Sequence, residues 1–216
     1  MKIFNKFKLL RMYINFRNLP TITNRIYLEF RIFQKRILSQ IYGFDSWHIN
    51  SYRDRNYAKY IVALLNSREI RGSALEIGCG LGDITRRLNF RNVQGFDKDK
   101  NVLKAAKFIS ILNILKRNWV SYTRFDVLTN QLEEKYDVIL LVNWIHNIES
   151  KHLKLLIQTF YSKNLNLGGD LVIDVVNNSG YRYNHSFVEL GDGLGAAITV
   201  SDVFDYGRRV ISFRKI

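Results

Sequence analysis

The nine residues Leu75–Asp83, LEIGCGLGD, constrain the fold of this chain more than any other segment. A short apolar run ends in an acidic residue, and glycines follow at alternate positions, Gly78, Gly80 and Gly82. Glycine adopts positive φ angles and has no Cβ, so such a loop lets the backbone come close to a ligand. We therefore predict a strand over 74–77, a tight turn, and a helix over 83–89 whose N-terminus faces a nucleoside ligand.

Strand and helix patterns alternate along the rest of the sequence. Further strands are predicted over 93–96, 120–125, 136–142, 170–176, 196–200 and 208–214, and helices over 53–66, 101–116 and 149–165, the last ended by Gly168-Gly169. This alternation predicts an α/β fold with a mostly parallel sheet covered on both faces. The last two strands have no long helix between them, which indicates an antiparallel hairpin at one edge.

Polar residues follow three of the predicted strands directly. Asp97 comes after 93–96, Asp126 after 120–125, and Asn143 at the end of the next strand. Ligands of open α/β sheets bind beyond the carboxyl ends of the strands, so these residues and the glycine turn belong to one site. Asp97 is placed to accept hydrogen bonds from both ribose hydroxyls of a nucleoside, and Asp126 from an adenine amino group.

These motifs resemble those of class I S-adenosylmethionine-dependent methyltransferases, over most of residues 53–216. The resemblance implies a Rossmann-like, seven-stranded sheet, S-adenosylmethionine as cofactor, and direct methyl transfer. The dinucleotide-binding fingerprint G-x-G-x-x-G is the rival pattern, but the third glycine here comes one residue too early for it. The cofactor-binding residues implied by the resemblance are Glu76, Gly78, Cys79, Gly80, Gly82, Asp97, Lys98, Asp126, Val127 and Asn143.

Methyl transfer from a sulfonium is a direct displacement that needs no metal, and it depends mainly on alignment of the reactants. A base helps when the acceptor is a hydroxyl, because the hydroxyl proton must leave. His146, three residues after Asn143, is the candidate general base. The alternative is a packed or capping histidine. Cys79 is interpreted as a small residue that fits the loop, not as a nucleophile.

Two further segments are candidates for contact with the acceptor. Trp47 and His48, in the sequence FDSWH, precede the first helix of the domain and could cover the site as a lid, or anchor the N-terminal segment. Asn177, Tyr181 and Arg182 follow the strand over 170–176, and their hydrogen-bonding groups suit a hydroxylated substrate; the alternative is an ordinary polar loop.

Residues 1–42 are predicted to form a basic, amphipathic helical arm, and residues 43–216 the methyltransferase domain. The arm has nine basic residues and one acid, within a chain of net charge +14. Such an arm could bind an anionic membrane surface, pack on the domain, or pair with a second copy in a homo-oligomer. The sequence has no long apolar run and a single cysteine, which favours a cytoplasmic protein, peripheral at the inner membrane face if the arm binds lipid.

The acceptor is predicted to be a small molecule or a glycan intermediate, because the sequence resembles bacterial methyltransferases of that kind. RNA is the alternative acceptor, with the arm binding phosphates. A third hypothesis is a non-catalytic subunit that binds the cofactor alone.

Overall fold

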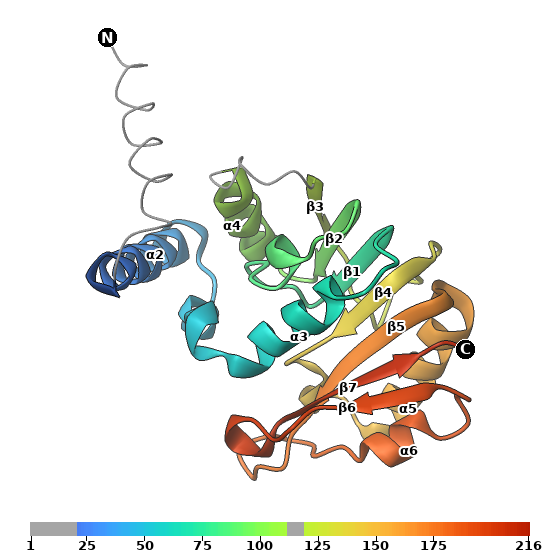
Figure 1. The fold of residues 1–216 in the computed structure, drawn as a ribbon. Helices are drawn as coiled ribbons and strands as arrows, with labels where there is room; N and C mark the ends of the chain where they lie inside the picture. Colours follow the sequence, from blue (N-terminus) through green and yellow to red (C-terminus); the bar gives the residue numbers. More distant parts are fainter. Residues whose placement is uncertain (1–20, 112–118) are drawn as a thin grey trace. The chain divides into compact units, whose positions relative to one another are not determined.

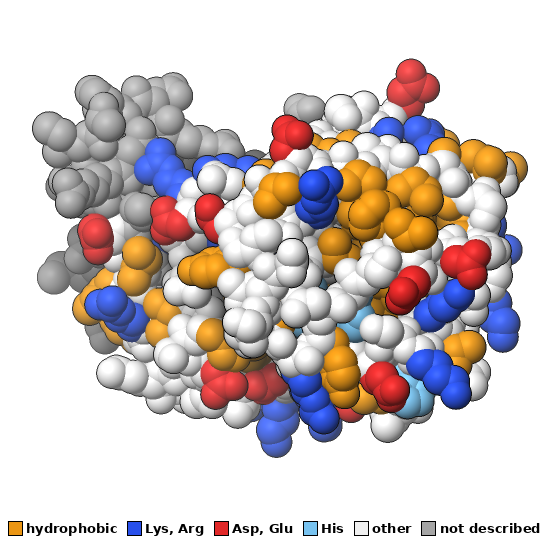
Figure 2. Space-filling model, turned by 90° about the horizontal axis from the view of Figure 1, so that it is seen from below, with side chains coloured by type: hydrophobic (Ala, Val, Ile, Leu, Met, Phe, Trp, Pro, Cys, Tyr) orange, Lys and Arg blue, Asp and Glu red, His pale blue; other side chains and the backbone are white. Residues whose placement is uncertain are grey.

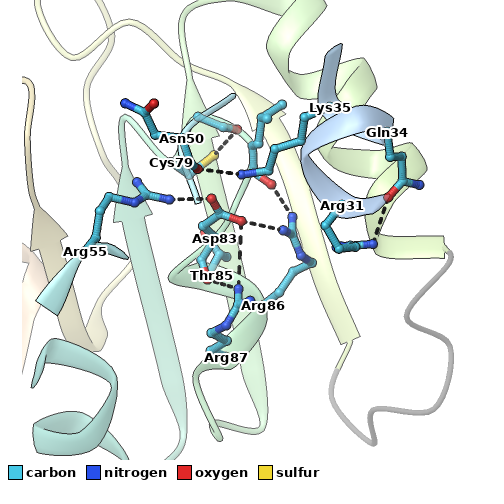
Figure 3. A network of polar contacts seen from close by, with 12 residues as sticks. Arg31, Gln34, Lys35, Asn50, Arg55, Cys79, Asp83, Thr85, Arg86 and Arg87 are labelled. Atoms are coloured by element: carbon cyan, nitrogen blue, oxygen red, sulfur yellow. Dashed lines mark hydrogen bonds and ion pairs between the residues drawn. The ribbon is translucent and has the colours of Figure 1, made fainter. Parts of the chain in front are cut away.

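The computed structural model describes residues 21–111 and 119–216, and the chain divides into two units after Ser51. The arm residues 1–20 and the end of the helix predicted over 101–116 therefore lie outside the described residues. The described part of the first unit consists of helix α2 (Thr21–Tyr42) and the short helix η2 (Ser46–Ile49). Within it, Lys35 Nζ donates a hydrogen bond to the Asn50 carbonyl oxygen at 3.0 Å (Figure 3).

The second unit is built on a seven-stranded sheet with the order β3-β2-β1-β4-β5-β7-β6 (Figure 1). Strands β1 to β5 are parallel, and β7 is antiparallel to both of its neighbours. This confirms the predicted Rossmann-like α/β sheet with a closing antiparallel hairpin. The strands are β1 (Ser73–Ile77), β2 (Asn92–Asp97), β3 (Trp119–Arg124), β4 (Tyr136–Leu141), β5 (Leu165–Val175), β6 (Ala197–Val200) and β7 (Arg209–Arg214).

Helices cover both faces of this sheet, as the apolar strands require. On one face, α3 (Asn56–Asn66) packs its buried residues against Ala74, Val138 and Val172. On the other face, α5 (Ser150–Thr159) and α6 (Phe187–Gly191) pack against their strand neighbours, such as Leu75 and Ile139. Successive strand residues point to opposite faces, so strands buried on both sides read as continuous apolar runs. Helix α4 (Lys100–Ile111) packs on β2 and β3.

The helix predicted over 83–89 is wrong, because only one 3₁₀ turn, η4 (Thr85–Arg87), follows the glycine loop. The Thr85 N–H donates to the Glu76 carboxylate at 2.8 Å instead of continuing a helical ladder. Beyond the turn, Phe90 is buried and Arg91 N–H donates to the Arg71 carbonyl at 2.9 Å, so the chain is already extended toward β2.

The third long helix ends within one residue of its predicted end, but Gly168-Gly169 does not end it. Helix α5 continues as a single π-helical stretch, η6 (Phe160–Asn164), and β5 begins at Leu165, before Gly168-Gly169. The register between β4 and β5 shifts at this point, with Tyr136 opposite Leu165 but Val138 opposite Asp170. Gly168 has φ +75°, the left-handed conformation that a bulge of this kind requires.

Candidate functional site

The glycine loop after β1 is held against the end of β2 by hydrogen bonds that its backbone N–H groups donate. Gly78, Gly80 and Gly82 have φ angles of 72°, 53° and 69°, which side chains with a Cβ rarely adopt. Cys79 N–H donates to the Phe96 carbonyl at 2.9 Å, and Gly80 N–H donates to Asp97 Oδ2 at 2.9 Å. A Cβ at Gly78 would overlap the ring of Trp144, whose Nε1–H donates to the Ile77 carbonyl at 2.6 Å. The loops after β1 and β4 are therefore in direct contact.

Asp97 ends β2 beside the glycine loop, as the sequence predicts. Its carboxylate also accepts a hydrogen bond from Asp99 N–H, at 3.0 Å to Oδ1. Each carboxylate oxygen accepts more than one hydrogen bond, so the group can also receive two hydroxyls of a ligand. Burial raises the pKa of Asp97, although the two backbone N–H groups oppose that rise. The backbone of the glycine loop beside this carboxylate fits the nucleoside part of S-adenosylmethionine, whereas the Cβ positions of Gly78 and Gly82 are filled by the Trp144 and Tyr122 side chains.

The buried side chains of Glu76 and Cys79 support the glycine loop. Glu76 is 5% exposed, and its Oε2 accepts hydrogen bonds from both the Thr85 hydroxyl and the Thr85 N–H. Burial raises the pKa of Glu76 to about 7. The Cys79 side chain is buried in a cluster with Leu103, Ala106 and Tyr122. Burial raises the pKa of this thiol well above its ordinary value, so the thiol stays protonated.

A cluster of arginines that sequence analysis did not identify surrounds Asp83 (Figure 3). Arg55, next to the start of α3, forms a close ion pair with Asp83 Oδ2. Arg86 Nη2 lies 2.9 Å and Arg87 Nη1 3.8 Å from Asp83 Oδ1. Arg86 also donates to the Leu81 carbonyl within the glycine loop. These contacts tie the loop to η4 and to α3.

The adenine side of the predicted site lies after β3. Leu128 N–H donates to Asp126 Oδ1 at 3.0 Å, and Asp126 N–H donates to Asn130 Oδ1 at 2.9 Å, which forms a compact turn. Val127 is half-buried and packs on the core, whereas Lys98 is exposed. Asp126 therefore lies in the turn that follows β3, the strand that pairs with β2.

Asn143, Asp174, His146 and Arg208 form a buried polar cluster where β4 and β5 end. Asn143 has φ +79°, and its N–H donates to Asp174 Oδ1 at 2.7 Å. His146 Nε2 lies 3.2 Å from Asp174 Oδ2, and the Arg208 guanidinium forms a close ion pair with the same oxygen. Asp174 is 0% exposed and His146 1% exposed. Burial, and then the Arg208 cation, lower the pKa of His146 to about 4, so the imidazole is neutral at pH 7.

Aromatic side chains enclose this cluster. The Tyr181 ring meets His146 edge-on, with centroids 4.9 Å apart, and the Tyr181 hydroxyl accepts a hydrogen bond from Arg208 Nη2 at 2.7 Å. Arg208 also lies 4.5 Å from the centroid of the Tyr57 ring, on α3. Tyr183 N–H donates to the His146 carbonyl at 3.1 Å. The loop after β5 is therefore attached to the turn that carries His146.

The other predicted acceptor residues are placed differently. Asn177 and Arg182 are exposed, and the Arg182 guanidinium lies 5.4 Å from the Tyr183 ring centroid. Trp47 and His48 belong to the first unit, where their rings stack 3.5 Å apart and Trp47 is 55% exposed. Within the second unit, the structure thus joins Tyr181, but neither Arg182 nor Asn177, to the His146 cluster.

Asp174 and Arg208 are the residues of this cluster that sequence analysis missed. An acidic residue inside the apolar run LVIDVV is a usable signal, because a buried carboxylate must be paired. Arg208 gives no comparable signal, since it follows a polar turn like many exposed arginines.

Comparisons with known proteins show the family and the fold of this chain. The family model of a methyltransferase domain matches residues 49–204. The N-methyltransferase NodS from Bradyrhizobium japonicum WM9, in complex with S-adenosyl-L-homocysteine, is 17% identical with a TM-score of 0.63, over 84% of this chain and 98% of that one. Magnesium protoporphyrin IX methyltransferase (ChlM) from Synechocystis PCC 6803, with bound SAM, is 17% identical with a TM-score of 0.64, over 82% of this chain and 89% of that one. No curated protein sequence matches the chain significantly.

Proposed function

The chain belongs to the methyltransferase domain family, uses S-adenosylmethionine as its cofactor, and, we propose, methylates a hydroxyl or an amine of a small molecule or glycan intermediate. One observation carries this proposal. Trp144, two residues before the buried neutral His146, packs over Gly78 of the glycine loop. The candidate base thus belongs to the same strand edge as the cofactor cradle.

The residues after β1, β2 and β3 would hold the cofactor. The backbone of Gly78, Gly80 and Gly82 would border it, Asp97 would accept its ribose hydroxyls, and Asp126 would bind its adenine amino group. Glu76 and Cys79 support the loop from below. When bound, the cofactor supplies an electrophilic methyl carbon on a sulfonium, which is a good leaving group.

His146 would then serve the acceptor. The imidazole is neutral at pH 7, so it can accept a proton from an acceptor hydroxyl, or a hydrogen bond that orients an amine. One similar structure is named an N-methyltransferase, and another is named a magnesium protoporphyrin IX methyltransferase. Amine and small-molecule acceptors are thus both compatible with this fold.

The arm would bring the domain to an anionic membrane surface. Along α2, Phe30, Phe33, Ile37 and Ile41 are exposed, and basic residues lie among them in the sequence. An apolar stripe flanked by cations is typical of a helix at a lipid interface. In the parts of the chain that the structure describes, no helix is long and apolar enough to cross a membrane.

RNA remains the second acceptor because of the net charge of +14. On the face shown in Figure 2, however, Lys and Arg side chains alternate with Asp and Glu side chains. RNA binding favours a continuous basic stripe. The described residues of this face therefore offer RNA no such stripe.

The test is to incubate the protein with methyl-labelled S-adenosylmethionine and an extract of the source cells, and to separate lipid-linked, small-molecule and nuclease-sensitive label. We expect label in the lipid-linked or small-molecule fraction, and none with Asp97→Ala. His146→Ala should lower the rate about 100-fold while cofactor affinity stays within about threefold. The exposed His152→Ala is the matched control and should keep full activity. Nuclease-sensitive label would replace the proposal with RNA methylation, and no label despite cofactor binding would favour the non-catalytic subunit.

A further inference from the structure

Asp174 must carry its negative charge within the cluster at the ends of β4 and β5. It is fully buried, and a buried carboxylate is stable only when it is paired and hydrogen-bonded. Arg208, whose side chain is 4% exposed, supplies the opposite charge, and Asn143 N–H supplies a donor that can only donate. Asp174 is therefore an acceptor toward each of its neighbours.

This assignment determines which nitrogen of His146 carries the proton. Neutral imidazole has one N–H donor and one bare nitrogen. Because Asp174 Oδ2 can only accept, His146 Nε2, 3.2 Å away, must be the protonated nitrogen. Nδ1 then presents its lone pair, and this atom is buried with no hydrogen-bond partner among the residues that the structure describes.

The other groups around the ring make their hydrogen bonds to other partners. The Tyr181 hydroxyl is hydrogen-bonded to Arg208, and the Tyr181 ring meets the imidazole edge-on. His185, 6.0 Å away between centroids, is hydrogen-bonded through Nε2 to the Ile145 carbonyl and through Nδ1 to Ser150. A buried polar atom without a partner destabilises the fold, and an arriving hydrogen-bond donor would remove that cost.

We infer that Asp174, held by Arg208, is a positioning residue that fixes the His146 proton on Nε2 and so leaves Nδ1 to receive the proton of the acceptor hydroxyl. This inference rests on the proposed function. The acceptor O–H bond breaks and its proton goes to Nδ1, while an oxygen electron pair forms the bond to the methyl carbon. The methyl–sulfur bond breaks with its electron pair remaining on sulfur, and His146 afterwards releases the proton to water.

Asp174 also connects His146 to the backbone of the turn after β4. The same carboxylate binds the N–H of Asn143, which adopts a left-handed conformation, and the imidazole three residues later. Tyr181 and Tyr183, from the loop after β5, contact His146. An acceptor that reaches the buried Nδ1 must displace part of its present cover, so acceptor binding would move this loop.

The first experiment is nitrogen-15 NMR of the histidine side chains in the full-length protein at pH 7. We expect His146 to show a protonated Nε2 and a bare Nδ1. In Asp174→Asn, an amide that keeps its oxygen on Asn143 N–H turns its NH₂ toward Nε2, and the proton should move to Nδ1. A wild-type proton on Nδ1 would overturn the inference, and this readout requires no acceptor.

The second experiment compares the rate of methyl transfer to the cell extract at saturating cofactor. Asp174→Asn should lower the rate at least about 100-fold with cofactor affinity within about threefold, and Arg208→Lys should retain more activity than Arg208→Met. Asp174→Asn should have no further effect in a His146→Ala background. An equal further loss there would mean that Asp174 does not act through His146.

Asp170→Asn is the matched control. Asp170 is also a buried aspartate of β5, paired with Arg68 at 2.9 Å and with Ser212, but it lies in the middle of the strand, away from the His146 cluster. Its substitution should lower stability and leave the rate unchanged. If the expected tautomer is found but no acceptor is ever methylated, the proposed function fails while the assignment of the His146 proton stands.

Discussion

Asp97 is the residue whose loss should weaken cofactor binding most directly. Its carboxylate holds Gly80 N–H and is placed to accept ribose hydroxyls. Each hydrogen bond to a charged group contributes roughly 1.5–3 kcal/mol, so Asp97→Ala should weaken S-adenosylmethionine binding by about 100-fold or more. Isothermal calorimetry checks this, with circular dichroism to show that the fold survives. Unchanged affinity would mean that the cofactor lies elsewhere.

Gly78 is required by its neighbour as well as by its conformation. Gly78→Ala should lower the free energy of unfolding by at least about 2 kcal/mol, because φ is +72° and the new Cβ would displace the Trp144 ring. Gly193→Ala is the control, since Gly193 has φ +80° but nothing within 4 Å of the added Cβ. Chemical denaturation of both variants isolates the Trp144 contribution. Equal losses would show that Trp144 adjusts without cost.

Single residues were predictable from sequence where chain geometry alone decides their place. The glycines and Asp97 follow strands whose ends must meet at one edge of the sheet. The acidic residue within LVIDVV signals that Asp174 is buried and paired, but its partners were not predictable. The contacts of Asp174 with His146 and Arg208 depend on which loops after β4, β5 and η7 (Asp205–Gly207) pack together. No periodicity in the sequence encodes that packing.

At the scale of elements, apolar periodicity located all seven strands, and local side-chain bonds account for the errors. The segment after the glycine loop has helix-forming residues, but Thr85 is bonded to Glu76 and Arg86 to Leu81. Gly168-Gly169 is typical of a helix end, yet it serves a bulge in β5. A pattern read along the chain does not include hydrogen bonds from outside the segment.

Helix α2 exposes apolar side chains that are expected to contact lipid. Replacing Phe33 and Ile37 together by serine in the full chain should weaken binding to anionic vesicles by about tenfold or more, because these side chains supply apolar area at the lipid interface. Leu167→Ser, which changes a more exposed apolar residue of β5, should have no effect. Vesicle co-sedimentation distinguishes the two. Unchanged binding by the double variant would exclude α2 as the lipid contact.

For the whole molecule, two buried groups give stability opposite pH dependences. The pKa of His146 falls from 6.5 to about 4 on folding, so the unfolded chain binds more protons and stability is lost as the pH drops through that range. The pKa of Glu76 rises from 4.5 to about 7, so the folded chain binds more protons and stability is lost as the pH rises through that range. Each contribution is about 3 kcal/mol, and they offset each other between pH 4.5 and 6.5.

Replacing either Glu76 or His146 should reveal the pH dependence of stability that the other residue causes. In Glu76→Gln, the free energy of unfolding should rise with pH between 4.5 and 6.5, and in His146→Asn it should fall over the same interval. Urea denaturation at several pH values measures both slopes, and the slope of the wild-type protein should lie between them. Parallel profiles for the two variants would contradict the opposing contributions.

The position of β7 affects how the chain can fold during synthesis. It is the last strand along the chain, yet it lies between β5 and β6, and Arg208 immediately precedes it. While the ribosome is still making the segment before residue 208, β6 has no strand beside it and the Asp174 charge has no counterion. A nascent chain stalled before residue 208 should therefore expose an unfinished sheet edge to chaperones, and a chain whose residues 208–214 have left the ribosome should not.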